Sequence, residues 1–326
     1  MRFVFTLLLG LAVFAQAQDV PADPLVHTYS IVAVDSVTGE IGAAVQSHWF
    51  SVGSLVIWAE AGVGAVATQS FVNPAFGPEG LKLMKAGKSP QEALQQLLEA
   101  DEGRDFRQVA FIDAQGNTAA WTGKKCIPEA GHRAEKYFSV QANLMLRNTV
   151  WDAMARAFKT TKGPLAERLV AALEAAQREG GDIRGQQSAA LLVVRAKPTG
   201  KIWEDRLIDL RVEDHPRPVE ELKRLLRLHR AYEHMNRGDL AVEKGDEEGA
   251  LREYSTAETM FPENLEMKYW HAVALVNMGR LSQALPLFKE IFTRDPNWKI
   301  LTPRLIKNGL LKVTPEQLQQ ILQVTP

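Results

Sequence analysis

One threonine lies where its hydroxyl and its own amine can do chemistry together. Thr28 opens the apolar run Thr28–Val34, which follows a removable leader. When a threonine becomes the first residue of a mature chain, its hydroxyl can attack a carbonyl while the free α-amine takes the proton. The pKa of an α-amine is ordinarily about 7.7–8.0, so a useful share is neutral at neutral pH. Threonine also favours strands, so the alternative is that Thr28 is purely structural.

Several polar side chains at strand ends or glycine-rich turns can assist such a nucleophile. Gln69 and Asn143 are candidate oxyanion donors, each worth about 3 kcal/mol in the transition state. Gln187 is a third amide of this kind and is assigned to the substrate. Arg184 or His48 can bind a substrate carboxylate. Buried amides often bond neighbouring loops instead, and that reading stays open for Asn143 and Gln187.

His132, which follows Gly131, is either a turn residue or an acid–base group that contacts the substrate. The run His48-Trp49-Phe50 is either a ligand wall or a loop whose aromatic rings cover the core. The histidines are dispersed through the sequence, and none forms a paired helical ligand set, so we predict no metal. The sequence also has no phosphate loop and no nucleophile-elbow motif, and we predict no cofactor.

The elements that must position Thr28 follow from hydrophobic patterning. Apolar runs predict strands, and spaced leucines predict helices, the second of which opens with a capping box at Ser89, Pro90 and Glu92. Strands in clusters with helices grouped between them favour an α+β domain. Two stacked antiparallel sheets with helices outside both, four layers in all, fit this order. The predicted strands are 28–34, 41–45, 55–59, 63–68, 108–112, 118–122, 137–141, 189–194 and 206–212, and the predicted helices are 79–87, 89–98, 149–160 and 164–179.

Six stretches of the first two-thirds of the chain resemble a bacterial family, domain of unknown function 1028. The resemblance runs from about residue 28 to residue 213. The stretches are Thr28 to Ala33, Gly62 to Gln69, Asn73 to Leu81, Cys126 to His132, Gln141 to Leu144 and Gly180 to Ala190.

The resemblance implies a four-layer αββα sandwich like that of the N-terminal-nucleophile hydrolases. The members of the family that this chain resembles have no settled biochemical function. Many members begin Met-Thr-Phe-Ser, so that removing methionine exposes the threonine matching Thr28. In this sequence Thr28 stands ten residues inside the expected exported chain, which begins at Gln18. Exposing Thr28 therefore requires a second cleavage, after His27.

A change of pattern at residues 214–218 marks a predicted domain boundary, beyond which everything is helical. Here Gly245, Ala250, Tyr254 and Pro262 recur thirty-four residues later as Gly279, Ala284, Phe288 and Pro296. That period is typical of tetratricopeptide repeats. We predict two repeats, at about 231–264 and 265–298, within a domain of residues 214–326, capped by helices at 218–236 and 299–322. The alternative is a pair of helical hairpins with chance spacing.

Residues 1–17 are typical of a secretory signal. Arg2 precedes the apolar run Phe3–Phe14, and Ala15-Gln16-Ala17 has a cleavage pattern. We expect cleavage after Ala17, a periplasmic or secreted product, a flexible lead-in or propeptide at 18–27, and no stable membrane anchor. A net charge of −1 and a single cysteine give no reason to expect nucleic acid or an internal disulfide.

Two functions remain open from the sequence. The first is an exported amidohydrolase of the N-terminal-nucleophile type acting on a small amide or peptide-like substrate. The second is a non-catalytic protein that binds a ligand in the sandwich. Under both, the helical repeats dock a protein or peptide partner, and a homo-oligomer is plausible.

Overall fold

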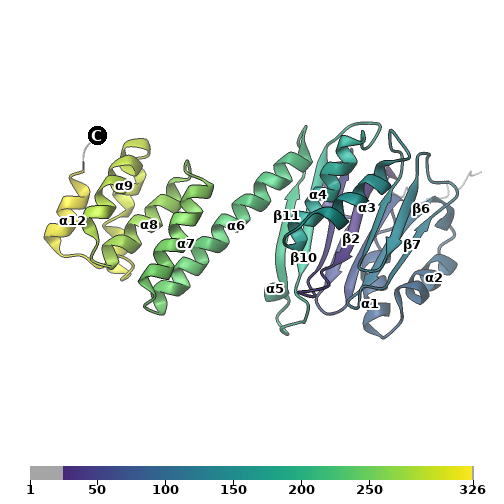
Figure 1. Cartoon of the computed structure of the whole chain (residues 1–326), viewed down its shortest axis with the longest axis horizontal. Coiled ribbons are helices and arrows are strands. Elements are labelled where there is room, and N and C mark those ends of the chain that lie inside the picture. The colour runs from purple at the N-terminus through teal and green to yellow at the C-terminus, as the bar shows by residue number, and fades with distance from the viewer. Residues whose placement is uncertain (1–24, 325–326) are drawn as a thin grey trace, which may run out of the picture.

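The structure, a computed structural model, describes residues 25–324 (Figure 1). It is a mixed α+β fold with two antiparallel sheets, followed by a helical region. The predicted leader and most of the predicted lead-in lie outside the described residues. Among residues 25–324, no helix has the length and apolar character needed to cross a bilayer.

The six-stranded sheet holds Thr28 in one of its inner strands. Its order is β11-β10-β3-β2-β9-β8, and the central strands β2 and β3 are buried along their whole length. The prediction that these two strands are covered on both faces is confirmed. The strands are β2 (Thr28–Val34), β3 (Ile41–Ser47), β8 (Gly131–Glu135), β9 (Phe138–Ala142), β10 (Ser188–Val194) and β11 (Arg206–Val212).

The second sheet has five strands in the order β1-β5-β6-β7, with β4 also paired to β5. Its first strand corrects an expectation, because residues 25 and 26 are not part of a flexible lead-in. They form β1, which pairs antiparallel with Phe71 and Ser70 of β5. The strands are β1 (Leu25–Val26), β4 (Ile57–Glu60), β5 (Gly64–Phe71), β6 (Arg107–Asp113) and β7 (Thr118–Thr122).

Apolar side chains fill the space between the sheets and the space under the helices on each outer face. Helices α3 (Val150–Thr160) and α4 (Leu165–Arg178) cover the six-stranded sheet. Helices α1 (Phe76–Lys85) and α2 (Pro90–Ala100) cover the other sheet. The capping box at the start of α2 is confirmed, since the Ser89 hydroxyl accepts from the Glu92 backbone N–H and the Glu92 carboxylate accepts from the Ser89 backbone N–H. Helix α1 begins at Phe76 rather than after Pro78, where the sequence predicted its start.

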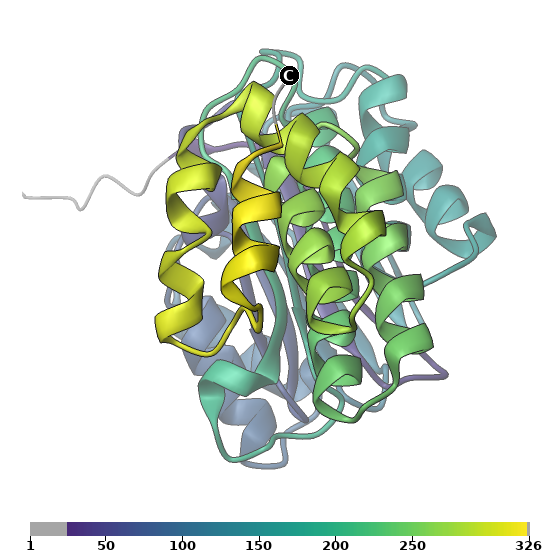
Figure 2. The same ribbon diagram turned by 90° about the vertical axis from the view of Figure 1, so that its left-hand side faces the viewer.

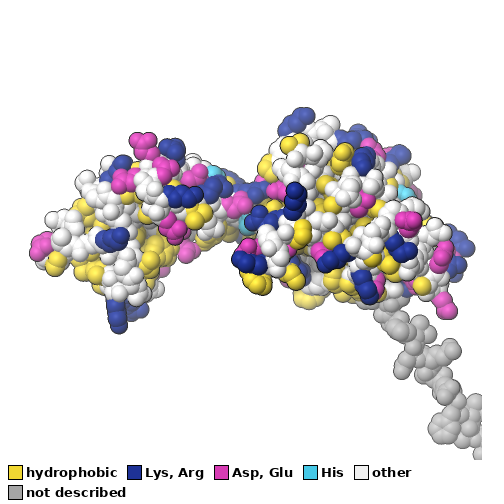
Figure 3. Space-filling model, turned by 90° about the horizontal axis from the view of Figure 1, so that it is seen from below, with side chains coloured by type: hydrophobic (Ala, Val, Ile, Leu, Met, Phe, Trp, Pro, Cys, Tyr) yellow, Lys and Arg dark blue, Asp and Glu magenta, His cyan; other side chains and the backbone are white. Residues whose placement is uncertain are grey.

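Helix α6 (Pro218–Glu243) joins two lobes: the first lobe, which holds both sheets, and the helical lobe, which holds the helices that follow α6. Its first turns pack Val219, Leu222 and Leu226 into the core beneath α4, and its second half belongs to the helical lobe. The sequence predicted a capping helix that ends at residue 236, but the structure continues this helix without a break to Glu243. Figure 1 shows the helical lobe standing apart from the sheets, Figure 2 views the same lobe from its end with the sheets behind it, and Figure 3 shows the narrow waist between the lobes.

The remaining helices stack in the helical lobe. They are α7 (Glu247–Met260), α8 (Leu265–Asn277), α9 (Leu281–Arg294), α10 (Asn297–Leu301), α11 (Arg304–Lys307) and α12 (Pro315–Leu322); the short α5 (Ile202–Asp205) and the 3-10 turns η1 (Val52–Ser54) and η2 (Arg104–Phe106) belong to the first lobe. Helices α7 to α11 pack on their neighbours in the chain, and α12 packs back on α9.

Candidate functional site

Thr28 is fully buried at the first position of β2, and the residue before it is buried too. His27 is only 3% exposed, and it links β1 of one sheet to β2 of the other. The strand register pairs Thr28 with Ser47 of β3. The chain therefore passes between the two sheets at the His27–Thr28 peptide bond, and any chemistry at Thr28 takes place in a desolvated interior.

The carbonyl oxygen of His27 accepts two hydrogen bonds from side chains distant in sequence. Ser47 Oγ donates at 2.5 Å and Arg184 Nη2 donates at 2.8 Å. Arg184 is held in place by Asp182, whose carboxylate is fully buried and accepts from Nη2 at 2.6 Å and from Nε at 3.0 Å. A hydroxyl and a charged guanidinium thus converge on one buried peptide carbonyl, and charge-assisted hydrogen bonds of this kind are the stronger ones.

Next along the chain, the carbonyl oxygen of Thr28 is held by the two amides predicted to serve as oxyanion donors. Gln69 Nε2 donates at 3.1 Å and Asn143 Nδ2 at 3.4 Å, while the Asn143 backbone N–H donates at 3.1 Å. Both side chains therefore come together at Thr28, as the sequence suggested. They bind its own backbone rather than an open space for substrate.

These two residues belong to an amide cluster that consists of Gln69, Gln108, Gln141 and Asn143, all completely buried. Gln108 of β6 is its centre. Gln108 Oε1 accepts from Gln69 Nε2 at 2.8 Å and from Asn143 Nδ2 at 2.9 Å. Gln108 Nε2 donates to the Ala142 carbonyl at 2.9 Å and the Gly131 carbonyl at 3.2 Å. The cluster joins the two sheets through hydrogen bonds rather than through apolar contact.

A serine extends the amide cluster toward β9. Ser30 Oγ donates to Gln69 Oε1 at 2.5 Å and accepts from Gln141 Nε2 at 2.6 Å. Gln141 Oε1 in turn accepts from Ser139 Oγ at 3.1 Å. Satisfied networks of this kind hold their members in one arrangement, because an unpaired member in a low-dielectric interior is costly.

Burial sets the protonation state of the imidazoles at the site. Desolvation lowers the pKa of His27, and its hydrogen bond to Asn143 opposes that effect only in part. Nδ1 of His27 lies 2.9 Å from Asn143 Oδ1, so the neutral ring can donate there. Burial likewise lowers the pKa of His132, helped by the neighbouring Arg133 charge. Both rings are therefore biased toward the neutral form.

Two residues with unusual backbone geometry follow the oxyanion candidates directly. Ser70, after Gln69, has φ 75°, and Leu144, after Asn143, has φ 58°. Positive φ costs a residue with a Cβ about 1–2 kcal/mol. A strained backbone conformation persists only where the surrounding structure enforces it, and such residues are common at functional sites. Here the strained conformation turns the chain sharply beside each amide that holds Thr28.

The other predicted site residues lie around this centre without joining it directly. The backbone N–H of His48 donates to Asp182 Oδ2 at 3.3 Å, and Gln187 Nε2 donates to Asp214 at 3.1 Å. His132 is not in a turn: it lies in strand β8, which the sequence did not predict. Its Nδ1 contacts Thr122 Oγ1 at 2.8 Å, and Thr122 accepts from Gln108, so His132 reaches the cluster through two bonds.

Sequence reasoning missed several residues that complete the site: His27, Ser47, Gln108, Gln141 and Asp182. One signal was available, because a glutamine lies within each of several mostly apolar strands, at positions 46, 69, 108 and 141. Nothing in the sequence pairs those positions with one another. Among residues 25–324, no group of three or more His, Cys, Asp or Glu side chains could hold a metal ion.

Comparison with known proteins identifies the class. Residues 28–222 match the family model described as a family of unknown function, DUF1028, and the chain belongs to that family. The match starts at Thr28 and ends inside α6. A similar solved structure is the crystal structure of protein SPO2555 from Silicibacter pomeroyi, also assigned to DUF1028. It is 31% identical, with a TM-score of 0.56, over 62% of this chain and 88% of that one. No curated protein matches the chain.

Proposed function

We propose that this protein is an exported amidohydrolase whose nucleophile, Thr28, becomes N-terminal when the His27–Thr28 bond is cleaved. Its substrate is a small amide or a peptide-like molecule. The observation that carries the proposal is the pair of donors on the His27 carbonyl oxygen, Ser47 Oγ at 2.5 Å and Arg184 Nη2 at 2.8 Å. Donors preset on a buried carbonyl stabilise the negative charge that forms there during attack.

The cleavage needs only the chain and one water molecule. The Thr28 hydroxyl oxygen adds to the His27 carbonyl carbon, and the charge that develops on the carbonyl oxygen faces Ser47 and Arg184. The bond from that carbon to the Thr28 nitrogen then breaks as the nitrogen takes up the hydroxyl proton, leaving an ester on Thr28. Water hydrolyses the ester, releasing the His27 carboxylate and restoring the hydroxyl beside a free amine.

Removal of His27 and β1 leaves the nucleophile beside a ready-made site. Ser47 and Arg184 then face the position that a substrate carbonyl takes, and Gln69 and Asn143 hold the Thr28 backbone so that its hydroxyl and amine keep a fixed orientation. The amine serves as base for attack on the amide, and water clears the acyl-enzyme. We assign His48, Gln187 and His132 to the edges of the substrate pocket.

The start of the family match at Thr28 supports this proposal, since the segment before it lies outside the shared region. So does the arrangement of layers, with two facing antiparallel sheets between pairs of helices. We propose that these layers form the four-layer αββα sandwich of the N-terminal-nucleophile hydrolases. We also propose that residues 1–17 are a signal peptide and that the product is periplasmic or secreted.

For the helical region, we propose two tetratricopeptide-like repeats that dock a protein partner, beyond a domain boundary after residue 213. In support, the repeated positions have matching environments: Ala250 and Ala284 are fully buried, as are Tyr254 and Phe288 to within 3%. The glycines that end the preceding helices, Gly245 and Gly279, have φ of 73° and 75°. Glycine is favoured at such left-handed positions.

A second candidate function is non-catalytic ligand binding on the same fold. It is favoured by the way the segment before Thr28 packs, since β1 pairs with β5 and His27 is buried. If the His27–Thr28 bond persists in the exported protein, no free amine is available as base.

The test is the intact mass of the protein recovered from the periplasm or medium. The proposal expects a wild-type chain that begins at Thr28. The Thr28→Ala chain should still begin at Gln18, whereas the Thr28→Ser chain, which keeps a hydroxyl, should be cleaved like the wild type. Ser47→Ala should slow cleavage about 10²–10³-fold, the usual cost of one oxyanion donor. A wild-type chain that remains at Gln18 would refute the catalytic proposal and leave the binding function.

A further inference from the structure

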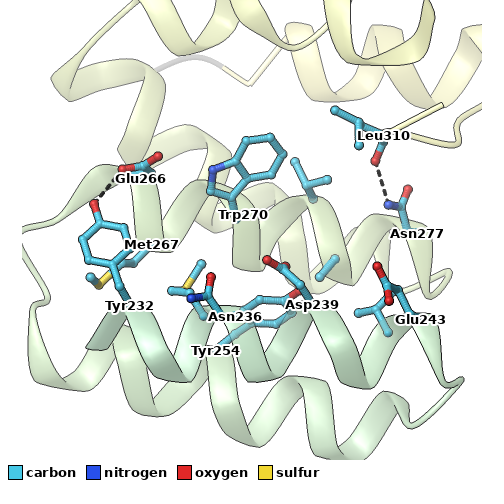
Figure 4. Close-up of a pocket in the computed structure, with 14 residues that line it drawn as sticks. Tyr232, Asn236, Asp239, Glu243, Tyr254, Glu266, Met267, Trp270, Asn277 and Leu310 are labelled. Atoms are coloured by element: carbon cyan, nitrogen blue, oxygen red, sulfur yellow. Dashed lines mark hydrogen bonds between the residues drawn. The ribbon is translucent and has the colours of Figure 1, made fainter. Parts of the chain in front are cut away.

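A groove of about 510 Å³ lies in the helical lobe, between the second half of α6 and α8 (Figure 4). Tyr232, Asn236, Asp239 and Glu243 follow one another along α6 at intervals of three or four residues, so they share one face of that helix. Trp270 and Asn277 line the opposite side from α8, and Tyr254 of α7 contributes to the wall. The groove is therefore amphipathic, with aromatic rings beside polar groups.

The charge of the groove has one sign only. Its lining includes the carboxylates of Asp239, Glu243 and Glu266, and no Lys, Arg or His. Among residues 25–324, none of the three forms an ion pair, although Tyr254 donates to Asp239 at 2.6 Å and Tyr232 to Glu266 at 2.8 Å. A phenol is a neutral donor, so neither hydrogen bond supplies a counter-charge. The groove thus presents negative charge that the chain itself does not neutralise.

Carboxylates elsewhere in the same helices are paired. Glu221 binds Arg224, Glu233 binds Arg230, and Glu253 binds Arg237. Within the groove, by contrast, two like charges stand four residues apart on α6, an arrangement that destabilises a helix by a few tenths of a kcal/mol. A cation between them relieves that repulsion, so the missing counter-charge points to an external partner.

The rim of the groove is held before any partner arrives. Asn277 Nδ2 donates to the Leu310 carbonyl at 2.9 Å, and Asn277 Oδ1 accepts from the Lys312 N–H at 2.8 Å. This ties the loop after α11 to α8 at one end, as Figure 4 shows for Leu310. A site that is already ordered loses little conformational freedom on binding.

We propose that the groove binds an extended basic segment of a partner protein, with a Lys or Arg side chain between Asp239 and Glu243. This rests on the proposed docking role of the helical region and names the chemistry of the partner. Apolar side chains of the segment pack on Trp270, whose ring face also attracts a cation. From Tyr232 to Glu243 the helix rises by about 16 Å, the length of about five extended residues.

The experiment uses the full chain and fluorescence anisotropy with two labelled pentapeptides, one alternating lysine with leucine and one alternating glutamate with leucine. The proposal expects the basic peptide to bind and the acidic one not to bind. Asp239→Asn with Glu243→Gln should weaken binding about tenfold or more, because each substitution keeps shape and an acceptor but removes charge. Binding should also fall as salt rises from about 0.01 M to about 1 M, which shortens the Debye length from about 30 Å to about 3 Å.

The matched control is Glu248→Gln, an exposed carboxylate at the start of α7 outside the groove, which should change affinity less than twofold. Equal binding of the two peptides, no binding of the basic one, or an unaffected double variant would each overturn the proposal. Thr28→Ala protein should bind the basic peptide as tightly as wild type. A failure of the groove is therefore separable from a failure of cleavage at Thr28.

Discussion

Gln108 provides the strictest test of the amide cluster, because its two amide atoms have opposite tasks. Oε1 only accepts, from Gln69 and Asn143, while Nε2 only donates, to Thr122 and to the carbonyls of Gly131 and Ala142. Gln108→Glu keeps the accepting oxygen but places a second oxygen against those acceptors. Gln108→Met keeps the approximate volume and removes both functions.

The magnitudes follow from the hydrogen-bond contacts that Gln108 makes while completely buried: two at Oε1, and three acceptors that share the two hydrogens of Nε2. At a net worth of about 1 kcal/mol each, with some partners retaining other bonds, Gln108→Met should cost about 3 kcal/mol of unfolding free energy. Gln108→Glu should cost about 3–5 kcal/mol at neutral pH, since it buries an uncompensated charge. For a lobe of this size, a loss of about 3 kcal/mol lowers Tm by about 6–12 °C.

The pH dependence distinguishes the two variants. Burial against carbonyl oxygens should raise the folded-state pKa of the introduced carboxyl above its unfolded value of about 4.3. The folded state then holds a proton that the unfolded state releases, so stability falls as pH rises between the two pKa values. The cost of Gln108→Glu relative to wild type should therefore be smallest below about pH 4.3 and grow toward neutrality. The cost of Gln108→Met should stay constant.

Urea unfolding followed by tryptophan fluorescence, repeated from acid to neutral pH, measures both effects. The exposed amide Gln95 of α2 is the control, and Gln95→Glu and Gln95→Met should each change stability by less than about 0.5 kcal/mol. A cost below about 1 kcal/mol for Gln108→Met, or a pH-independent cost for Gln108→Glu, would refute the view that this cluster is a closed, buried network.

Two further substitutions test other buried polar groups of the first lobe. Both amide atoms of Gln46 are buried without a partner among residues 25–324, so Gln46→Met should stabilise the fold by about 1–3 kcal/mol and raise Tm; a lower Tm would contradict this. Burial lowers the pKa of His132, so its contribution to stability is complete above about pH 6.5 and is lost as pH falls through the folded pKa. His132→Asn should flatten that acid-side loss in urea titrations, and an unchanged slope would show that the ring is not desolvated.

Local signals made much of the fold predictable. Helix and strand formation depends on residues within a few positions of one another. The signals that the sequence carries are all of this local kind: the apolar runs of β2, β5 and β10, the capping box of α2 and the change of pattern at 214–218. The resemblance to the DUF1028 family is confirmed over residues 28–222. Among the strands, the sequence missed β1, which has only two residues, and β8 (Gly131–Glu135), which has no apolar run.

The candidate site was predictable only in part. Thr28, Gln69 and Asn143 were singled out as polar residues at strand ends, and the structure brings all three together. Their partners could not be inferred, because the bonds join residues that are far apart along the chain: Ser47 to His27 across 20 residues, and Arg184 to His27 across 157. Such pairs depend on strand register and on how the sheets face each other.

By itself, the sequence determined most of the strands and helices, which family the first two-thirds belongs to, and that a threonine opens the central hairpin. Only the tertiary structure decided that the peptide carbonyl before this threonine meets Ser47 and Arg184, and that the one after it meets the amide cluster. The physical reason is that propensity and hydrophobic period act over a few residues. Hydrogen bonds in a desolvated interior instead join whichever groups the packed sheets bring within about 3 Å.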